Sequence, residues 1–296
     1  MKALLIQVDD TPFPNRALRC WGGYLKEKGH EVFYNSGCSD PDIVKISCVF
    51  EWNAPKARGI AQLWRALGAH VELGGYGVDK HARLPEEVEH HMPDYEGIDF
   101  SFGFTTRGCI RRCEFCDVWR IEGGFREHAP IEEFWDPAHD KIVFLDNIFN
   151  ASKLMGEKLR FCKEHELKVS VTQGFDARLI TKEQARIIAD HWPYYNWKFN
   201  DTALYTAWDR MEDEDLVLRG IKNLIEAGIP ARKIIPYVLV SYNTSFDQDM
   251  YRFRKLRELG VYPFVMPYNN KPHPMRRWGQ RPALFKTVPF EEYHAT

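Results

Sequence analysis

The chain has 296 residues, of which 44% are hydrophobic and 14% aromatic, so it can fill the core of one large or two modest globular domains. Its 40 basic and 42 acidic residues leave a net charge of −2, which excludes a strong overall attraction to nucleic acid or to a membrane surface. No run of about 18 apolar residues is present, and the start MKALLIQVDD becomes polar too early for a signal peptide. We therefore expect a cytoplasmic protein with reduced thiols and no membrane partner.

Strand and helix patterns alternate through the first hundred residues, which is typical of βα units in a parallel sheet. The predicted strands are residues 3–8, 31–34, 43–49 and 71–73, and the predicted helices are residues 16–28 and 54–67. This pattern favours a small Rossmann-like α/β domain. Residues 80–97 contain two prolines and few β-branched residues and are typical of a linker, so the first domain with its linker spans residues 1–97.

Six further strands are predicted in residues 98–296, with helical patterns between them. The strands are residues 98–104, 141–145, 168–172, 203–207, 234–240 and 262–266, and the helices are residues 152–165, 181–190, 215–227 and 246–259. Six βα units are too few for a closed eight-stranded barrel, so the sequence predicts an α/β fold with an open, partial (β/α)6 barrel and a C-terminal extension. Reactive groups of such folds gather at the carboxyl ends of the strands.

Three of the seven cysteines lie within eight positions, in the stretch FTTRGCIRRCEFCDVW that follows the first of these strands. They are Cys109, Cys113 and Cys116. Clustered thiolates in a reducing compartment select zinc or an iron–sulfur cluster. A structural zinc site typically takes four ligands in two separated pairs, and the sequence offers no second CxxC and no close pair of histidines. A set of three leaves one coordination position open, which is where chemistry takes place at a metal.

The pattern C-x3-C-x-F-C resembles that of the radical S-adenosylmethionine superfamily, which places it after the first strand of a partial barrel. The resemblance implies a 4Fe-4S cluster held by Cys109, Cys113 and Cys116, with S-adenosylmethionine bound to the fourth iron. It also implies reductive cleavage of S-adenosylmethionine to methionine and a 5'-deoxyadenosyl radical that abstracts hydrogen from a substrate.

The same resemblance implies residues that contact S-adenosylmethionine. Phe115 would pack near the adenine, and Asp146 and Asn147, in VFLDNIF, take the place of a Gly-Gly-Glu-like stretch that contacts the methionine amine in relatives. An alternative is that Phe115 is an ordinary aromatic plug beside the cluster, and that Asp146 caps the helix that follows it.

Polar residues after the later strands complete the predicted site. Gln173 and Arg178 follow the third strand, and the arginine could pair with the carboxylate of S-adenosylmethionine or with a substrate anion. An ion pair of Arg178 with Asp176 or Glu183 at the surface is the alternative. Asp209 follows the fourth strand and Ser241 the fifth, where contacts with the ribose, the adenine or the substrate are expected.

Two further resemblances concern the ends of the chain. The stretches YVLVSYNTSFDQDMYRFRKLRELGVYPFVMPYN and RRWGQRPALFKTVPFEEY resemble uncharacterised radical S-adenosylmethionine proteins of phage and bacterial genomes, which name no reaction. The first domain is similar to the cobalamin-binding domain that precedes many such cores, but DDTPFPNR contains no histidine for the cobalt. We therefore expect a reduced remnant without cobalamin. Cys20, Cys38 and Cys48 do not match the spacing of a second cluster and are typical of buried small hydrophobes.

Basic residues surround the cysteines and recur near the C-terminus beside two aromatic residues. They are Arg107, Arg111, Arg112 and Arg120, and then Lys271, Arg276, Arg277, Arg281 and Lys286, with Trp278 and Phe285. Such a set could grip a phosphate backbone and stack a base, offset the charge of a cluster, dock an acidic electron donor of the flavodoxin or ferredoxin type, or form a solvated tail.

The resulting hypothesis is a radical S-adenosylmethionine enzyme that acts on an unidentified small molecule or nucleotide. The alternatives are modification of a nucleic-acid base by the same chemistry, a non-catalytic iron–sulfur or zinc module, and cobalamin-dependent methyl transfer.

Overall fold

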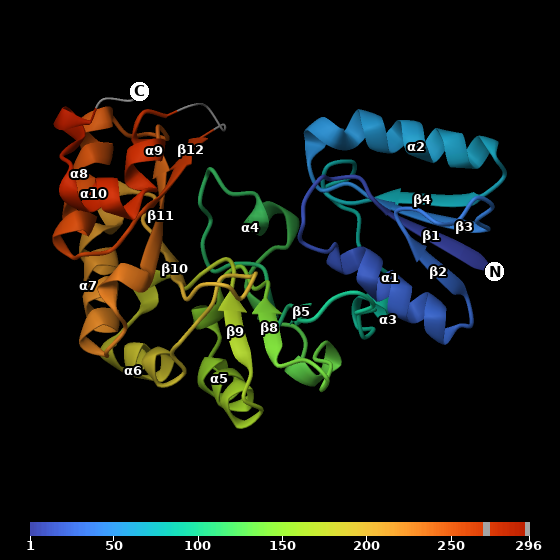
Figure 1. Ribbon diagram of the computed structural model, residues 1–296, viewed down its shortest axis with the longest axis horizontal. Coiled ribbons are helices and arrows are strands. Elements are labelled where there is room, and N and C mark those ends of the chain that lie inside the picture. Colours follow the sequence, from blue (N-terminus) through green and yellow to red (C-terminus); the bar gives the residue numbers. More distant parts are fainter. Residues whose placement is uncertain (269–272, 294–296) are drawn as a thin grey trace. The chain divides into compact units, whose positions relative to one another are not determined.

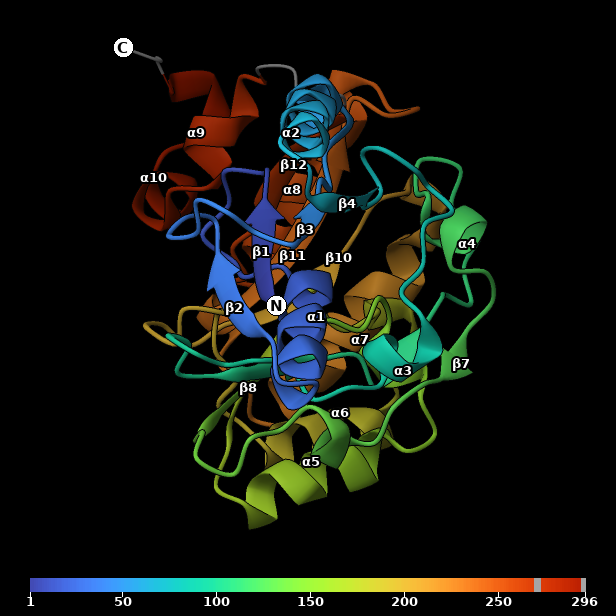
Figure 2. The ribbon, with the colours of Figure 1, turned by 90° about the vertical axis from the view of Figure 1, so that its right-hand side faces the viewer.

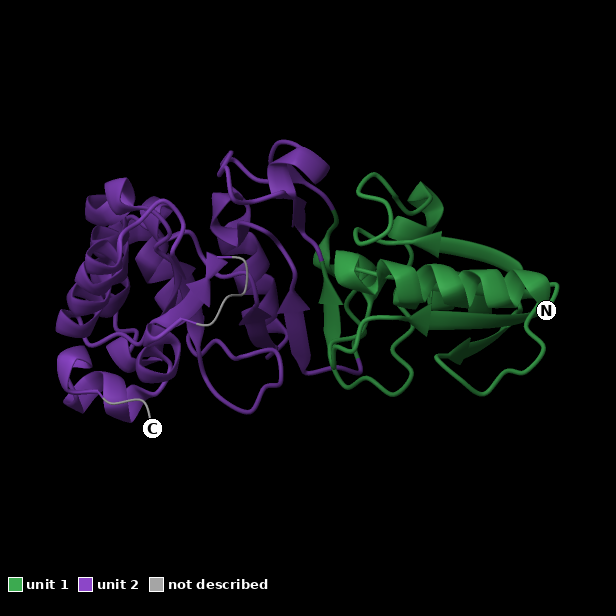
Figure 3. Ribbon diagram, turned by 90° about the horizontal axis from the view of Figure 1, so that it is seen from above, with its two compact units in different colours: residues 1–103, 129–137 green, residues 104–128, 138–296 purple. Residues whose placement is uncertain are grey.

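The computed structural model describes residues 1–268 and 273–293, which divide into two compact units (Figure 3). The first unit is Met1–Gly103 with Ala129–Pro137, and the second is Phe104–His128 with Ala138–Thr296. The chain thus leaves the first unit six residues after the predicted boundary at residue 97 and returns to it once. The returning segment is held within the first unit by the Tyr95 hydroxyl, which donates to the Phe134 carbonyl, and by the close approach of the Phe134 ring to Gly103.

The first unit is a parallel four-stranded sheet with a helix on each face, in the order β2-β1-β3-β4 (Figures 1 and 2). Its main elements are β1 (Lys2–Gln7), α1 (Arg16–Glu27), β2 (Glu31–Tyr34), β3 (Ile43–Ser47), α2 (Ala54–Ala66) and β4 (His70–Gly74). Alternate residues of β1 face opposite ways: Leu4 packs in the cluster that contains α2, whereas Ala3 and Leu5 pack with α1. The Rossmann-like arrangement predicted for residues 1–97 is present in this sheet.

Two segments of the first unit differ from the prediction. The predicted linker, residues 80–97, contains a short helix, α3 (Glu86–Glu89), whose Glu89 accepts a hydrogen bond from Arg16 at 2.9 Å. The predicted strand at residues 98–104 is reduced to β5 (Ser101–Gly103). An amphipathic turn stabilised by contacts with a distant helix leaves little local signal, which is why a linker was expected here.

The second unit contains parallel strands followed by helices. The strands are β6 (Thr106–Arg107), β7 (Arg126–Glu127), β8 (Lys141–Phe144), β9 (Lys168–Val171), β10 (Leu204–Ala207), β11 (Ile234–Val240) and β12 (Phe264–Pro267). The helices are α4 (Val118–Ile121), α5 (Met155–Glu164), α6 (Lys182–Asp190), α7 (Glu214–Glu226), α8 (Phe246–Glu258), α9 (Met275–Gly279) and α10 (Pro282–Thr287). β8 pairs with β9 and β10-β11-β12 form a sheet, all in parallel, whereas β6 and β7 form a short antiparallel ribbon.

Local signals explain why the predicted helices of this unit are confirmed within a few residues. α6 begins after Thr181, whose side chain accepts from the Gln184 amide, and α8 begins with a capping box between Ser245 and Gln248. The short elements α4, α9, α10, β6 and β7 were not predicted, because two to six residues carry no readable periodicity. None of the helices in residues 1–268 and 273–293 is long and apolar enough to cross a membrane.

The close contact between α7 and the backbone of Ala177 in the second unit can be tested by substitution. A Cβ atom at Gly220 in α7 would lie 1.9 Å from the carbonyl oxygen of Ala177, whereas a Cβ atom at Gly156 in α5 would meet only Ile187, at 3.8 Å. We expect Gly220→Ala to lower the free energy of unfolding by about 1–3 kcal/mol through forced separation of backbone segments. Gly156→Ala is the matched control and should leave it unchanged or slightly higher in urea denaturation. Equal stability of the two variants would contradict this packing.

Candidate functional site

The three clustered cysteines lie on one loop, residues 108–123, which connects β6 to α4 and the start of β7; we call it the cysteine loop. The ribbon of β6 and β7 brings its two ends together, and the amide of Cys109 donates to the carbonyl of Gly123 at 3.4 Å. Gly108 has a φ of 72°, and a Cβ atom there would lie 2.2 Å from the carbonyl oxygen of Gly124. A glycine is therefore required where the loop closes.

A buried carboxylate fixes the chain just before this loop. Asp146 follows β8, is fully buried, and accepts hydrogen bonds from the Thr105 amide at 3.1 Å and from the hydroxyls of Thr105 and Thr106, both at 2.6 Å. Burial raises the pKa of Asp146, while the hydrogen bonds from the two threonines oppose the rise. The structure thus shows that Asp146 holds the chain ahead of the cysteine loop and is not the N-cap of a helix that follows it.

A second carboxylate closes the loop at its far end. Glu122 accepts hydrogen bonds from the Gly108 amide and the Asn147 side chain, both at 2.9 Å, and from Arg107 at 3.1 Å. Asn147 therefore supports the loop through Glu122. The sequence analysis missed Glu122, although an acid directly before Gly123 and Gly124 was a signal that the loop turns back on itself there.

The cysteines themselves are reduced and partly buried, and none of them forms a disulfide. The Cys109 sulfur accepts from the Arg111 amide at 3.3 Å, while the Trp119 indole donates to the Cys113 carbonyl at 3.0 Å. Burial raises the pKa of the Cys109 and Cys113 thiols. Arg120 donates to the Cys116 carbonyl at 3.1 Å, so α4 fixes the backbone that carries the thiols.

The type of donor fits the chemistry of an iron–sulfur cluster, because cysteine thiolates are the ligands that such clusters take. Across residues 1–268 and 273–293, no group of three or more His, Cys, Asp or Glu side chains is gathered so that it could hold a metal ion.

A chain of alternating charges joins the cysteine loop to the ends of β9 and β10. Asp176 accepts from Arg111 at 3.1 Å and from two nitrogens of Arg178 at 2.8 and 2.9 Å; Arg178 also donates to Asp213 at 2.9 Å, and Asp213 accepts from Arg210 at 3.2 Å. The side chains of Asp176 and Arg178 are only 8% and 15% exposed. The ion pair of Arg178 with Asp176 was an alternative in the sequence analysis, but it is buried rather than at the surface.

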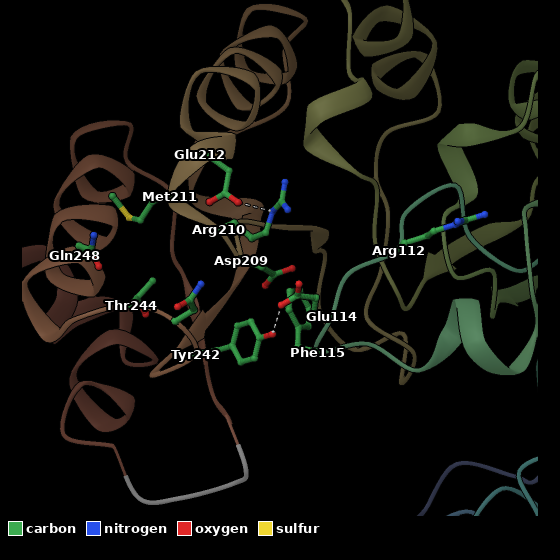
Figure 4. Close-up of a pocket in the computed structure, with 11 residues that line it drawn as sticks. Arg112, Glu114, Phe115, Asp209, Arg210, Met211, Glu212, Tyr242, Thr244 and Gln248 are labelled. Atoms are coloured by element: carbon green, nitrogen blue, oxygen red, sulfur yellow. Dashed lines mark hydrogen bonds and ion pairs between the residues drawn. The ribbon is translucent and has the colours of Figure 1, made fainter.

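A cavity of about 400 Å³ opens beside the cysteine loop, at the carboxyl ends of β10 and β11. It is lined by Arg112, Glu114 and Phe115 from the loop, by Asp209, Arg210, Met211 and Glu212 after β10, and by Tyr242, Asn243, Thr244 and Gln248 after β11. Figure 4 shows Glu114, Phe115 and Asp209 converging near the Tyr242 hydroxyl, with Arg112 pointing away. The Tyr242 hydroxyl donates to Glu114 at 3.3 Å, and its ring packs edge-on to Phe115 at 5.2 Å between centroids.

Among the residues that line the cavity, Asp209 has a strongly raised pKa. Burial raises its pKa to about 6, although Arg178 and Arg252 oppose the rise. A carboxyl group with such a pKa can exchange a proton near neutral pH, which is common at functional sites.

A buried ion pair positions the rim of the cavity that follows β11. Arg252 is fully buried, pairs with Asp249 at 2.5 Å, and donates to the carbonyls of Trp208 at 2.7 Å and Leu239 at 2.6 Å, so it joins the ends of β10 and β11. Asp249 also accepts from the Ser241 amide at 3.1 Å. Ser241 and Asn243 both adopt positive φ, of 63° and 51°, a strained conformation that persists where the surroundings enforce it.

The predicted site residues therefore fall into separate groups. Phe115 and Asp209 line the cavity. Asp146 and Asn147 support the cysteine loop, and Arg178 belongs to the charge chain. Gln173 and Ser241 are exposed and are not among the residues that line the cavity. Sequence reasoning missed Asp249 and Arg252 altogether, because Arg252 donates to backbone carbonyls of β11 and of the segment after β10, and Asp249 accepts from the Ser241 amide after β11.

Only some members of the predicted basic and aromatic set are exposed at the surface. Trp278 and Phe285 are buried and pack on each other at 4.9 Å between centroids, so neither can stack a base. Three arginines of the set form hydrogen bonds with the protein itself: Arg107 donates to Glu122, Arg111 to Asp176 and Arg120 to the Cys116 carbonyl. Exposed residues of the set are Arg112, Arg120, Arg276, Arg277, Arg281 and Lys286; Lys271 lies outside the described residues.

In the first unit, the loop after β1 folds onto the loop after β3. Asp9 accepts from the amides of Val49 at 2.5 Å and Phe50 at 3.2 Å and from Asn53 at 2.9 Å. At this edge of the sheet, where the strand order reverses between β1 and β3 and where ligands of such sheets bind, Asp9 also lines a cavity of about 580 Å³. Cys20 and Cys48 are buried, and Cys38 packs in the same hydrophobic cluster as Cys48.

No protein-family model matches this chain, and no curated protein matches it either.

The charge chain makes a prediction about acid stability. Burial opposes ionisation of Asp176, but Arg178 and Arg111 more than offset it, so its pKa lies below the ordinary value of 3.8. Its contribution to stability is present above pH 3.8 and is lost as the pH falls through the lower, folded-state value. We expect Asp176→Asn to cost about 3–5 kcal/mol near neutral pH and to lack this loss in acid. Asp190→Asn, which breaks an exposed pair with Lys163, should cost less than about 1 kcal/mol. Urea denaturation across pH measures both, and equal costs would contradict the buried role of Asp176.

Asp209 should have the opposite pH dependence. A raised pKa favours the folded state while the carboxyl is protonated, and that contribution is lost as the pH rises from 3.8 through about 6. Asp209→Asn should therefore raise the melting temperature at about pH 8, with a smaller effect at about pH 4. Glu212→Gln on the same rim is the control, for which no such pH-dependent gain is expected. A uniform effect of Asp209→Asn at both pH values would refute the assignment.

Proposed function

We propose that the protein is a radical S-adenosylmethionine enzyme. The observation that carries the proposal is that Cys109, Cys113 and Cys116 lie on one loop. The aromatic residue of the motif, Phe115, lines an adjoining cavity at the strand ends. The three cysteines would hold a 4Fe-4S cluster, and the cavity would take S-adenosylmethionine. When bound, these groups supply the electron and the sulfonium bond whose cleavage yields a 5'-deoxyadenosyl radical.

The charges and size of the cavity support a ligand of this kind. Its volume of about 400 Å³ lies within the range of small-molecule sites. Glu114, Asp209 and Glu212 line it, and of its two arginines Arg210 is paired with Glu212 and Asp213. A cationic sulfonium is favoured by such acidic groups and by the aromatic rings of Phe115 and Tyr242.

The residues around the cavity act by binding and positioning. Asp146, Glu122 and Asp176 hold the cysteine loop, and the Asp249–Arg252 pair holds the opposite rim, so little reorganisation is needed when a ligand binds. Asp209 is placed to give or accept a proton at a group bound in the cavity. Gln173 and Ser241, at the strand ends but exposed, would reach a ligand only at the cavity mouth.

The finer fold belongs to the same proposal. We infer that β8-β9 and β10-β11-β12 are parts of one open, partial (β/α)6 barrel, whose strands end at the cysteine loop and the cavity. A cytoplasmic electron donor of the flavodoxin or ferredoxin type would reduce the cluster. Cobalamin is not part of the proposal, because DDTPFPNR offers no histidine for the cobalt.

The first test measures cleavage of S-adenosylmethionine. We expect protein reconstituted without oxygen and reduced with dithionite to form 5'-deoxyadenosine, and Cys113→Ala to lose this activity completely because one iron loses its ligand. Cys162→Ala is the control, since that cysteine is buried within α5, away from the motif, and should keep the activity. A cluster that forms in both variants without any nucleoside product would favour a non-catalytic iron–sulfur module, and zinc in place of iron would favour a structural site.

A further inference from the structure

One face of the β10-β11-β12 sheet is not covered by helices and carries an aromatic surface. Helices α7 and α8 cover the other face (Figure 1), where Leu204, Ile234 and Val265 are buried. Gly279 of α9 also packs against Val265 from that side. The uncovered face consists of the alternate residues Tyr205, Ala207, Ile235, Tyr237, Leu239, Phe264 and Met266, and we call it the aromatic face.

The rings on this face form a corner. Tyr205 and Tyr237 are stacked, with centroids 5.4 Å apart and planes 7° from parallel, and Phe264 meets Tyr237 edge-on at 5.4 Å and 81°. Phe264 is 40% exposed and Met266 43% exposed. A flat ring placed in such a corner contacts the face of one ring and the edge of another, which is the preferred geometry of aromatic pairs.

The polar groups of the aromatic face are unused. Neither the Tyr205 nor the Tyr237 hydroxyl forms a hydrogen bond with another group in the described part of the chain, although both side chains are partly buried. Buried tyrosine hydroxyls usually find a partner. None of the seven residues is charged, so this face suits an uncharged ring that carries hydrogen-bonding groups on its edge.

The cavity lies at the carboxyl ends of β10 and β11, two of the strands that carry the aromatic face. Tyr242, which lines the cavity, packs on Phe115 on one side and on Tyr268, just after β12, at 4.8 Å between centroids on the other. We propose that the aromatic face binds the base of a nucleoside or mononucleotide, next to the ligand of the cavity. A nucleobase is flat, uncharged and edged with several donors and acceptors, whereas a neutral aromatic amino-acid side chain carries at most two such groups. As a substrate site the proposal rests on the proposed function, but binding can be tested without it.

A nucleic-acid strand is a weaker fit than a single nucleoside. Base stacking along a strand needs a cationic groove beside the rings. The aromatic face has no cation, and the aromatic residues nearest to the basic C-terminal helices, Trp278 and Phe285, are buried.

The test measures binding of guanosine, cytidine, uridine and thymidine to the full chain by equilibrium dialysis. Adenosine is left out because it shares its base with S-adenosylmethionine. We expect at least one nucleoside to bind with a Kd below about 1 mM. Tyr237→Ala should weaken it about 10-fold or more through lost stacking, and Tyr237→Phe should weaken it less.

A second variant on the aromatic face and one control variant distinguish lost binding from failed folding. Phe264→Ala, at a more exposed position on the same face, should weaken binding in the same direction even if Tyr237→Ala fails to fold. Tyr251→Ala is the control, because this exposed tyrosine of α8 bonds Glu214 away from the aromatic face, and binding should be unchanged. The proposal is overturned if no nucleoside binds, if both Tyr237→Ala and Phe264→Ala bind normally, or if only aromatic amino acids or single-stranded oligonucleotides bind.

The outcomes separate this inference from the proposed function. Nucleoside binding that Tyr237→Ala weakens, without any 5'-deoxyadenosine in the reduced protein, supports the aromatic face and counts against the radical chemistry. Formation of 5'-deoxyadenosine in protein that binds no nucleoside supports the chemistry and overturns the aromatic face. The Cys113→Ala variant should bind nucleosides as the unaltered chain does, because it changes only the cysteine loop.

Discussion

The desolvated carboxylate of Asp146 is the constraint on which the cysteine loop depends. A buried carboxylate is costly unless its oxygens are hydrogen-bonded, and here an amide and two hydroxyls just ahead of the loop satisfy them. These hydrogen bonds therefore fix the position of the backbone where it enters the cysteine loop. Glu122 fixes the exit in the same way, and Asp176 fixes the middle through Arg111. Three carboxylates, each with its partners on a different segment, thus set where the thiols lie.

The second unit separates its charges from its apolar surface. Acids and paired arginines surround the cavity at the strand ends, whereas the uncovered face of β10-β11-β12 carries aromatic and aliphatic residues only. This division matches two neighbouring ligands of different polarity, one cationic and one flat and neutral. The raised pKa of Asp209 and the positive φ of Ser241 and Asn243 both cost stability, and such costs are typical of sites retained for function rather than for folding.

The first unit has the organisation of a ligand-binding α/β sheet, and Asp9 lines a cavity of about 580 Å³ at the carboxyl edge of β1. Asp9 binds the backbone after β3, and a Cβ atom at Gly75 after β4 would lie 2.4 Å from the Cys48 carbonyl oxygen. The loops at the carboxyl edge of β1, β3 and β4 therefore pack on one another.

The sequence by itself determined the order and type of the main elements, because hydrophobic periodicity and caps such as Thr181 and Ser245 are local signals. It also determined the cysteine motif and its place after the first strand predicted in residues 98–296. Only the tertiary structure decided what the polar residues do. Asp146 meets Thr105 across 41 positions, and Asp176 meets Arg111 across 65, and no local pattern records such pairs. The burial of Trp278 and the return of Ala129–Pro137 to the first unit have the same origin, since both depend on side chains that lie close in space and far apart in the chain.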